Sequence, residues 1–384
     1  MMKSLIYILR IARHEWSSIL HDKGILLFVI FMPLGYPIIY SLIYTNEVVH
    51  DVPTVVLDEC NSSESRELLR HIEATREVRF IDRCHTLAEV QNHLREDAFA
   101  LIRIPSDFSR RLARKEQATL GLYTDMSSMM YYKSLLMAMN GAVSQMNHEI
   151  LVERYLPATT DRQAEVTAVP LTYDNVSLYN PQVGFACFLV PPVLMLIIQQ
   201  SMMLGIGMSA GRLRQQWKGR LLPRRFHLMH SVHIVVGRSL VYLGIYLMMA
   251  IYMCMGITRL FGLPQLAHYG TLLAFLLPYL LACAFFAITC SGFIYRREDC
   301  ILLFVFFSAP LLFVSGISWP GASMPAFWKA VSCLFPSSFG INAYVRISSM
   351  GASLRDVALE WRALWMQAGF YFLTACLLYR RHGS

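Results

Sequence analysis

The sequence predicts a polytopic α-helical membrane protein with six transmembrane helices and an α/β extracytoplasmic domain inserted between helices 1 and 2. Of the 384 residues, 55% are hydrophobic and 16% are charged, whereas soluble domains average about 25% charged residues. A helix crosses the hydrocarbon core of a bilayer with about 20 apolar residues. Six stretches meet this requirement, at 25–44, 183–208, 239–257, 271–293, 301–319 and 361–379. The polar block 45–180 is long enough to fold as a domain, and a five-helix transmembrane block, 181–384, follows it.

Residues 1–24 are the first predicted element, a cytoplasmic amphipathic helix that lies in the membrane interface. Apolar residues recur on one face and polar residues on the other: Leu5, Leu9, Ala12, Trp16, Ile19 and Leu20 against Arg10, Arg13, His14 and Ser17. Trp is enriched at headgroup level, which suits this placement. The alternative is a cytosolic helix that packs on the transmembrane bundle. No small-residue cleavage site follows the first span, so we expect a permanent anchor.

The polar block alternates strand and helix patterns, which predicts a small α/β sheet domain. Extended or apolar segments fall at 53–57, 78–81, 98–104, 118–123 and 168–178, and helices at 63–74, 86–97, 107–115 and 127–155. The last helix carries a stripe of Leu135, Met139, Val143, Met146 and Ile150. This stripe packs on the sheet or, alternatively, contacts a second copy or an outer adaptor. A disulfide between Cys60 and Cys84 is left open.

The segment 211–238 is predicted to be a basic cytoplasmic loop between the second and third spans. It contains seven Lys and Arg residues and no Asp or Glu, and short loops of this kind stay in the cytoplasm. Both termini then lie inside, and the inside segments hold 15 Lys and Arg against four acids. The net charge of +8 therefore reflects membrane orientation, and no nucleic-acid partner is needed to explain it.

The segment 320–360, before the last span, is too apolar for a free loop. It is also too charged and too rich in Pro for a span. We interpret it as an outer re-entrant segment, with helices that dip part way into the outer leaflet.

Missing motifs narrow the function. No Gly-x-x-x-x-Gly-Lys-Ser/Thr loop occurs, and no ionisable residue lies deep in the six apolar stretches, which weighs against ion-coupled transport. Gly207-Met-Ser209-Ala-Gly211 matches a hydrolase nucleophile elbow but ends an apolar stretch, so we interpret it as a Gly-x-x-x-Gly helix-packing pattern. The three His residues of the basic loop have no Cys or carboxylate close by, and we predict no metal site and no catalytic residue.

Several short motifs along the whole chain resemble those of a known protein family. They are Val55-Val56-Leu57-Asp58, Asn61-Ser62, Ser65-Arg66, Ile104-Pro105-Ser106-Asp107-Phe108, Ser315-Gly316, Met324-Pro325, Leu334-Phe335-Pro336 and Gly351. In their order and span layout they are similar to the permease subunits of ABC type-2 exporters, in the subgroup with a large outer domain between spans one and two.

The resemblance implies a division of labour. Two permeases, identical or related, enclose a path, and two cytoplasmic ABC ATPases dock on the loop after span two and on the N-terminal helix. ATP and Mg bind to the ATPases, so this chain needs no cofactor. Substrates are hydrophobic drugs, lipids or other amphiphiles, which some members pass to a periplasmic adaptor and an outer-membrane channel. The expected location is the bacterial inner membrane, with multiple passes and both termini cytoplasmic.

Three sets of candidate site residues follow from this interpretation. They are Arg212, Arg214, Trp217, Lys218 and Arg220 for ATPase docking, Pro191, Pro192, Gln199 and Gln200 for the substrate path, and Trp319, Pro325 and Pro336 for an outer gate. Relatives carry acids in the docking loop, in the pattern Arg-Glu-x-Glu, where this chain has bases and amides. Either the ATPase has a more acidic groove or a paired permease carries the standard loop.

Two other functional classes are alternatives to an exporter. A membrane-anchored receptor or scaffold would bind a ligand or envelope partner with its outer domain, without transport. An intramembrane enzyme has no catalytic set in this sequence to support it.

Overall fold

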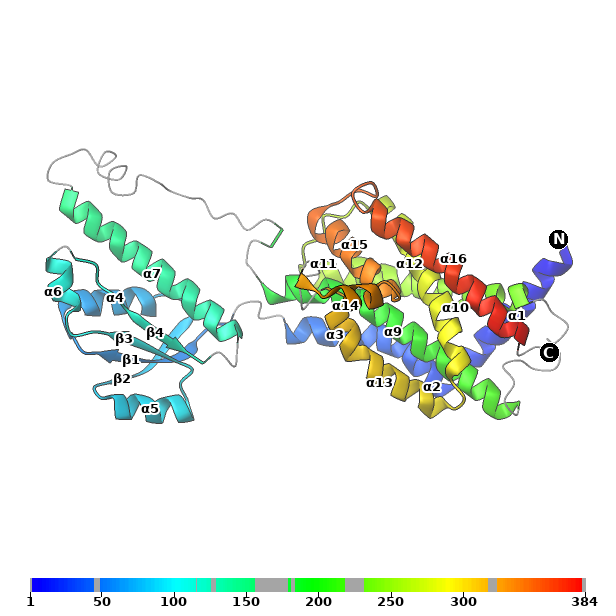
Figure 1. Cartoon of the computed structure of the whole chain (residues 1–384), viewed down its shortest axis with the longest axis horizontal. Helices are drawn as coiled ribbons and strands as arrows, with labels where there is room; N and C mark the ends of the chain where they lie inside the picture. The colour runs from blue at the N-terminus through cyan, green and yellow to red at the C-terminus, as the bar shows by residue number, and fades with distance from the viewer. Residues whose placement is uncertain are drawn as a thin grey trace. The chain divides into compact units, whose positions relative to one another are not determined.

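The computed structural model describes residues 2–44, 49–114, 116–125, 129–155, 179–180, 184–217, 231–316 and 323–381. The chain forms two compact units, and Figure 1 labels their elements. The membrane unit comprises Met1–Thr45 and Leu178–Ser384, and the sheet domain comprises Asn46–Ser177. The polar block of the sequence is therefore a unit separate from the apolar helices.

Helices make up the membrane unit where it is described. It begins with α1 (Met2–His21), α2 (Lys23–Leu26), a π-helical turn (Leu27–Phe31) and α3 (Met32–Ile43). After the sheet domain come α9 (Phe185–Gln216), α10 (Ser231–Ile251), a second π-helical turn (Tyr252–Ile257), α11 (Thr258–Leu260) and α12 (Tyr269–Cys290). A 3₁₀ turn (Ser291–Phe293) then leads to α13 (Arg297–Val314), α14 (Ala326–Ser332), α15 (Pro336–Met350) and α16 (Ala358–Arg381).

Four helical stretches within the described residues are long and apolar enough to cross a membrane. They are Lys23–Ile43, Phe185–Gln216, Ser231–Leu260 and Tyr269–Phe293, and they correspond to the first four predicted spans. Helices α13 and α16 cover most of the fifth and sixth, and each carries charged residues in its first turns. A membrane crossing by α13 and α16 stays a prediction.

The connection between the second and third spans is shorter than the sequence predicts. Helix α9 continues to Gln216 and α10 begins at Ser231, so both ends of the predicted loop 211–238 are helical. The charged side chains at these ends, Arg212, Arg214 and Arg238, have partners inside the membrane unit. Those partners replace the water molecules that would hydrate these side chains in an exposed loop. Residues 218–230 lie outside the described part of the chain.

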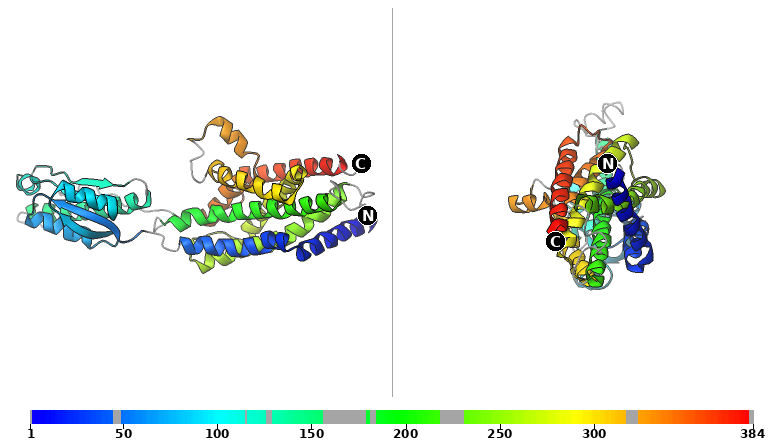
Figure 2. Two further views of the ribbon diagram at one scale, coloured as in Figure 1. Left: turned by 90° about the horizontal axis from the view of Figure 1, so that it is seen from below. Right: turned by 90° about the vertical axis from the view of Figure 1, so that its right-hand side faces the viewer.

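Helix α9 is the central helix of the membrane unit. It contacts α3, α10, α12, α13 and α15, and Figure 2 shows it in green between the blue helices of the first span and the yellow to red helices. Every residue from Val190 to Gly211 is buried. A helix that is apolar all round packs inside a bundle, because it has no face suited to water.

Glycines on α9 let neighbouring elements approach its backbone. A Cβ atom on Gly207 would lie 2.5 Å from Cys300 Sγ, and one on Gly211 would lie 2.9 Å from the backbone carbon of Arg296. Both contacts are too short for a side chain. The structure thus confirms the interpretation of this segment as a Gly-x-x-x-Gly packing pattern.

Helix α1 packs on α10 through a face that shares only Ile19 with the predicted apolar stripe. Ile11, Glu15 and Ile19 are buried, and α1 contacts α10. Most of the predicted apolar stripe points away from the bundle, with Leu9 54% and Trp16 43% exposed. A helix with one face on the bundle and another apolar face exposed fits the interface, and its placement in the membrane stays a prediction.

In its described residues, the sheet domain has four strands in the order β2-β1-β3-β4, with helices α4 to α7. Their bounds are β1 Val52–Asp58, α4 Ser63–Glu73, β2 Val78–Cys84, α5 Leu87–Glu96, β3 Ala100–Ile104, α6 Phe108–Ala113, β4 Gly121–Thr124 and α7 Met129–Tyr155. β1 runs parallel to β2 and β3, and β4 runs antiparallel to β3. This agrees with the predicted α/β domain. The predicted extended segment 168–178 lies outside the described residues.

The two faces of the sheet have different cores. Val52 and Val56 of β1 pack with α4 and α7, and Val55 and Leu57 pack with α5, as the two-residue period of a strand requires. The stripe of α7 lies in the first of these cores, so it packs on the sheet. Cys60 and Cys84 belong to opposite faces, and both are free thiols.

The motif after β1 caps the N-terminus of α4. Asp58 Oδ1 accepts the N–H groups of Cys60 and Asn61, and its Oδ2 accepts the Ser65 hydroxyl at 2.7 Å. The Ser62 side chain accepts the Ser65 N–H and caps α4. These bonds satisfy donors that the first turn of a helix leaves free.

Candidate functional site

The region predicted to dock an ATPase contains a buried ion pair between α1 and α10. Glu15 Oε1 lies 2.8 Å from Arg238 Nη2, and the two side chains are 4% and 2% exposed. The same carboxylate oxygen accepts the hydroxyls of Ser209 at 2.8 Å and Tyr242 at 3.0 Å, and Arg238 also donates to Tyr379. This Glu15 cluster joins α1, α9, α10 and α16.

The Glu15 carboxyl stays ionised in this setting. Burial alone would raise its pKa, but the charge of Arg238 and the hydrogen bonds from Arg238, Ser209 and Tyr242 outweigh burial. The pKa of Glu15 therefore lies below its ordinary value. These three partners compensate the charge that the fold has removed from water.

A second carboxylate, Asp22, joins the break between α1 and α2 to two later helices. Asp22 Oδ1 caps α2 by accepting the N–H groups of Gly24 and Ile25, at 3.0 and 3.3 Å. Its Oδ2 accepts Arg212 Nη1 at 3.1 Å and a further bond from Arg297. Burial opposes ionisation of Asp22, but the Ile25 N–H and the two guanidinium charges lower its pKa below the ordinary value.

Arg214 holds the turn between α12 and α13. The residue is 2% exposed, and its guanidinium donates to the carbonyls of Ile294 at 2.6 Å and Gly292 at 2.9 Å. The Tyr295 ring lies 4.6 Å from the guanidinium carbon, within the range of a cation–π contact.

The predicted docking residues therefore separate into two groups. Arg212 and Arg214 turn inward onto the bundle. Trp217, at the C-terminal end of α9, is 39% exposed and offers surface to a partner. Lys218 and Arg220 lie outside the described residues.

One of the predicted path residues, Gln200, lines a cavity with an aromatic wall in the membrane unit. Gln200 of α9 borders a space of about 350 Å³ between α3, α9 and α13. Its walls are Met32, Tyr36, Tyr40, Tyr44, Leu189, Val193, Leu196, Ile197, Gln200 and Phe304. We call this space the tyrosine cavity, because the rings of Tyr36 and Tyr40 of α3 and of its C-cap residue Tyr44 follow one another along its wall. Their centroids are 5.3 Å apart for Tyr36 and Tyr40 and 6.3 Å apart for Tyr40 and Tyr44.

The other predicted path residues lie elsewhere on α9. Gln199 Oε1 accepts the N–H of Ser337 at 2.6 Å and so ties α9 to the start of α15. Pro192 borders a different cavity of about 350 Å³, which Asn342 of α15 also lines. Pro191 is buried along α9. The structure thus brings Gln200, but not Gln199, to the tyrosine cavity.

The proposed outer gate is described only in part. Trp319 lies outside the described residues. Pro325 caps α14 and Pro336 is the first residue of α15, at helix starts where a missing N–H costs little. No residue of α14 is buried, whereas α15 buries one face that includes Pro336.

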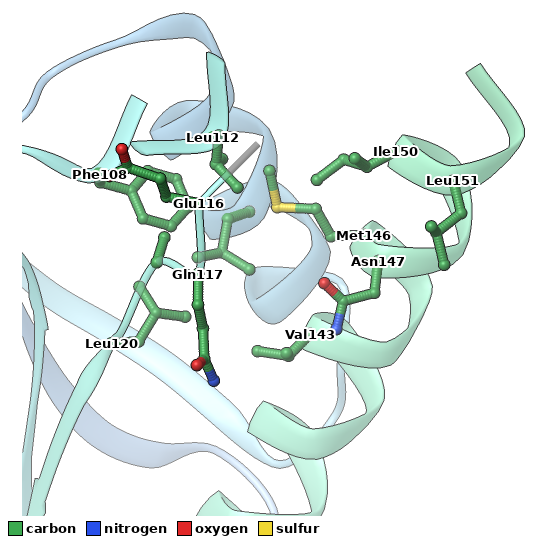
Figure 3. Close-up of a pocket in the computed structure, with 12 residues that line it drawn as sticks. Phe108, Leu112, Glu116, Gln117, Leu120, Val143, Met146, Asn147, Ile150 and Leu151 are labelled. Atoms are coloured by element: carbon green, nitrogen blue, oxygen red, sulfur yellow. The ribbon is translucent and has the colours of Figure 1, made fainter. Parts of the chain in front are cut away.

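The sheet domain has a pocket of its own, of about 420 Å³, between α6, α7 and the segment that leads to β4. Figure 3 shows Val143 and Met146 of α7 facing Phe108 and Leu120 across this space. Polar groups from Glu116, Gln117 and Asn147 also line the pocket. Such a mixture of an apolar lining and a few polar groups is typical of small-molecule sites.

Three side chains on α4 and α7 come close enough to share a metal ion. One ligand atom from each of Glu67, His71 and Glu149 lies within 4.8 Å of the others, where the sequence predicted no metal site. Gln145 donates to Glu149 at 3.1 Å. Two of the three residues are exposed, so water already solvates their carboxylates, and we assign this group no function.

The Glu15 cluster and the row of Tyr36, Tyr40 and Tyr44 along the tyrosine cavity were not predicted from the sequence. Glu15 stands four residues from both Ile11 and Ile19, which is one helical face, and an acid on a buried apolar face signals a partner. Tyr36, Tyr40 and Tyr44 share the same spacing.

Comparisons with known proteins cover almost the whole chain. Residues 23–377 match the model of a family described as ABC-2 family transporter protein. The chain is also similar to the probable multidrug ABC transporter permease YbhR of Escherichia coli K12, with 23% identity over 361 residues and 92% of each chain covered. The protein of the same description from Escherichia coli O157:H7 matches with the same identity and coverage.

Proposed function

Because the chain belongs to the ABC-2 transporter family as a transmembrane permease, we propose that it is the path-forming subunit of an ATP-driven exporter. It moves hydrophobic or amphiphilic molecules, drug-like or lipid-like, out of the cytoplasm or the inner leaflet. The name of the E. coli relative, a probable multidrug permease, supports this class of substrate. ATP is hydrolysed by a partner ATPase, since the permease family has no catalytic domain of its own.

The tyrosine cavity is the observation that carries the proposal. It lies between the first two spans and α13, and the described residues that line it include no Asp, Glu, Lys or Arg. Its volume of about 350 Å³ falls in the range of drug-sized sites. A neutral, largely apolar wall favours amphiphiles over small ions, because an ion entering it would lose its water without gaining a counter-charge.

The contacts around Glu15 and Asp22 support coupling to an ATPase. Each carboxylate bonds α1 or the α1–α2 break to helices that are far away in the sequence. A force applied at this end of the bundle therefore acts on several helices together. In this proposal the ATPase docks here on the cytoplasmic side, both termini lie inside, and the bilayer is the bacterial inner membrane. A second permease, identical or related, completes the path, and a periplasmic adaptor with an outer-membrane channel is a further partner.

Co-purification from native membranes tests the proposal. We expect an ABC ATPase to purify with the permease in mild detergent, and Trp217→Ala to reduce its recovery because that exposed side chain is at the proposed contact. Phe370→Ala, an exposed aromatic on α16, is the matched control and keeps the ATPase. A permease that purifies without an ATPase under every mild condition contradicts the proposal.

The pocket of the sheet domain favours a second function, ligand binding by a receptor or scaffold without transport. A receptor binds its ligand equally well without ATP or an ATPase and moves nothing across a membrane. Reconstituted vesicles separate the two: ATP-dependent uptake of a fluorescent amphiphile into inside-out vesicles supports the exporter, and saturable binding without uptake supports the receptor.

A further inference from the structure

The tyrosine cavity is built from aromatic faces and one amide, without a formal charge among its described lining residues. Tyr36 and Tyr40 of α3 and Tyr44, its C-cap residue, follow one another at intervals of four residues, and the Tyr44 ring lies 5.3 Å from the ring of Phe185 on α9. Gln200 adds the amide and is 9% exposed. Tyr36 is 42% exposed, so the cavity can be reached from the surface of the membrane unit.

An aromatic belt at the membrane surface is the plainer explanation for tyrosines in a span. A belt presents its rings to the lipid headgroups. Here Tyr40 and Tyr44 are only partly exposed, and all three tyrosines line one space that α9 and α13 close. The rings therefore form an internal wall rather than a belt alone.

Aromatic faces carry negative potential and attract cations. The attraction is strongest when the cation has lost its water, and it suits quaternary or delocalised cations, which are weakly hydrated. A small inorganic ion would lose too much hydration energy in this space. An anion would meet the negative ring faces with no Lys or Arg in the described lining to neutralise it.

We infer that the tyrosine cavity binds lipophilic organic cations, such as quaternary ammonium or phosphonium compounds. This inference rests on the proposed function and narrows its substrate class from amphiphiles in general to cationic ones. Tyr40 and Tyr44 supply the ring faces, and Gln200 fixes orientation with its amide.

Two probes of nearly equal shape and opposite charge test this inference: tetraphenylphosphonium and tetraphenylborate. Equilibrium dialysis measures their binding to the permease–ATPase complex in phosphatidylcholine nanodiscs, with empty nanodiscs as the blank. We expect Tyr40→Leu with Tyr44→Leu to weaken tetraphenylphosphonium binding about tenfold. The same double substitution leaves tetraphenylborate binding within about twofold.

Two control variants test whether the ring faces of the cavity cause the expected loss of cation binding. Tyr40→Phe with Tyr44→Phe keeps the ring faces and retains cation binding within about threefold. Phe370→Leu removes an exposed aromatic on α16, outside the cavity, and changes neither probe. Equal losses for both probes, or a Phe pair as weak as the Leu pair, would overturn the inference.

The experiments distinguish failure of the cation-binding inference from failure of the proposed exporter function. A complex that contains an ATPase and transports a neutral amphiphile, yet binds the two probes alike in all variants, is an exporter without cation selectivity. Absence of any ATPase removes the exporter proposal itself.

Discussion

At the scale of single residues, the role of a basic side chain near the second and third spans depends on the group that it bonds to. Its position in the sequence does not reveal that role. Arg212, Arg214 and Arg238 bond inside the membrane unit, to Asp22, to two backbone carbonyls and to Glu15. The sequence assigned all three to one solvated loop, because a charge count registers a side chain but not its partner. These Arg residues contribute to the charge bias that predicts the orientation in the membrane, and they also form bonds between helices of the membrane unit.

The Glu15–Arg238 pair gives a first prediction. Arg238→Met leaves a buried carboxylate without its counter-charge, and we expect a loss of about 3–5 kcal/mol in stability. The double variant Glu15→Leu with Arg238→Met recovers most of that loss, since neither charge remains. Thermal unfolding in detergent measures both, with the exposed Arg355→Met as the control. A double variant as unstable as the single one contradicts the pairing.

The lowered pKa of Glu15 gives a prediction for pH. A carboxyl whose pKa is lower in the folded state contributes stability that is present above its unfolded pKa and is lost as pH falls. The stability difference between the wild type and Glu15→Gln should therefore shrink as pH falls below about 4.5, the ordinary value. Unfolding midpoints at pH 7, 5 and 4 measure it, and a difference that stays constant over this range contradicts the prediction.

At the scale of elements, local patterns predicted the sheet domain well and the ends of the membrane helices less well. The strands and helices from β1 to α7 fall within a few residues of their expected positions, because capping residues such as Ser62 and Thr86 mark helix starts in the sequence. The end of α9 has no such mark. Its last turns are polar, and only the contacts of Arg212 and Arg214 with distant segments show why they are helical.

The close packing of α9 predicts the effect of small substitutions. Gly207→Ala places a methyl group 2.5 Å from Cys300 Sγ and 2.7 Å from Ile294 Cδ1, so we expect a loss of about 1–3 kcal/mol. Gly244→Ala on α10 is the matched control, because its Cβ meets nothing within 4 Å and Ala favours a helix. Thermal unfolding compares the two, and equal effects would contradict the packing described for α9.

At the scale of the whole molecule, the order of apolar and polar blocks predicted one span, a sheet domain and a set of later helices, and the structure has this order. Candidate site residues were harder to predict. Gln200 lines the tyrosine cavity together with α3 and α13, which lie far from it in sequence. Spacing along one helix identifies a face, but it does not identify what that face meets.

The predicted orientation can be checked with thiol reagents. Cys333, at the end of α14, is exposed and lies in the re-entrant segment expected on the outer side of the membrane. A membrane-impermeant maleimide added to intact spheroplasts should label it, and Cys333→Ser should remove one equivalent of label. In that background, Trp217→Cys should react only after the membrane is opened. Labelling of Trp217→Cys in intact spheroplasts would reverse the proposed topology.

The Glu15 cluster also has a consequence for biosynthesis. Glu15 and its guanidinium partner are 223 residues apart in the sequence, and chains are made at about 5–20 residues per second. For a period on the order of tens of seconds, the nascent chain carries the acid without its counter-charge, so α1 gains no ion-pair stabilisation until the third span has been translated. Final docking of the first helix is therefore a late step of assembly, although that helix leaves the ribosome first.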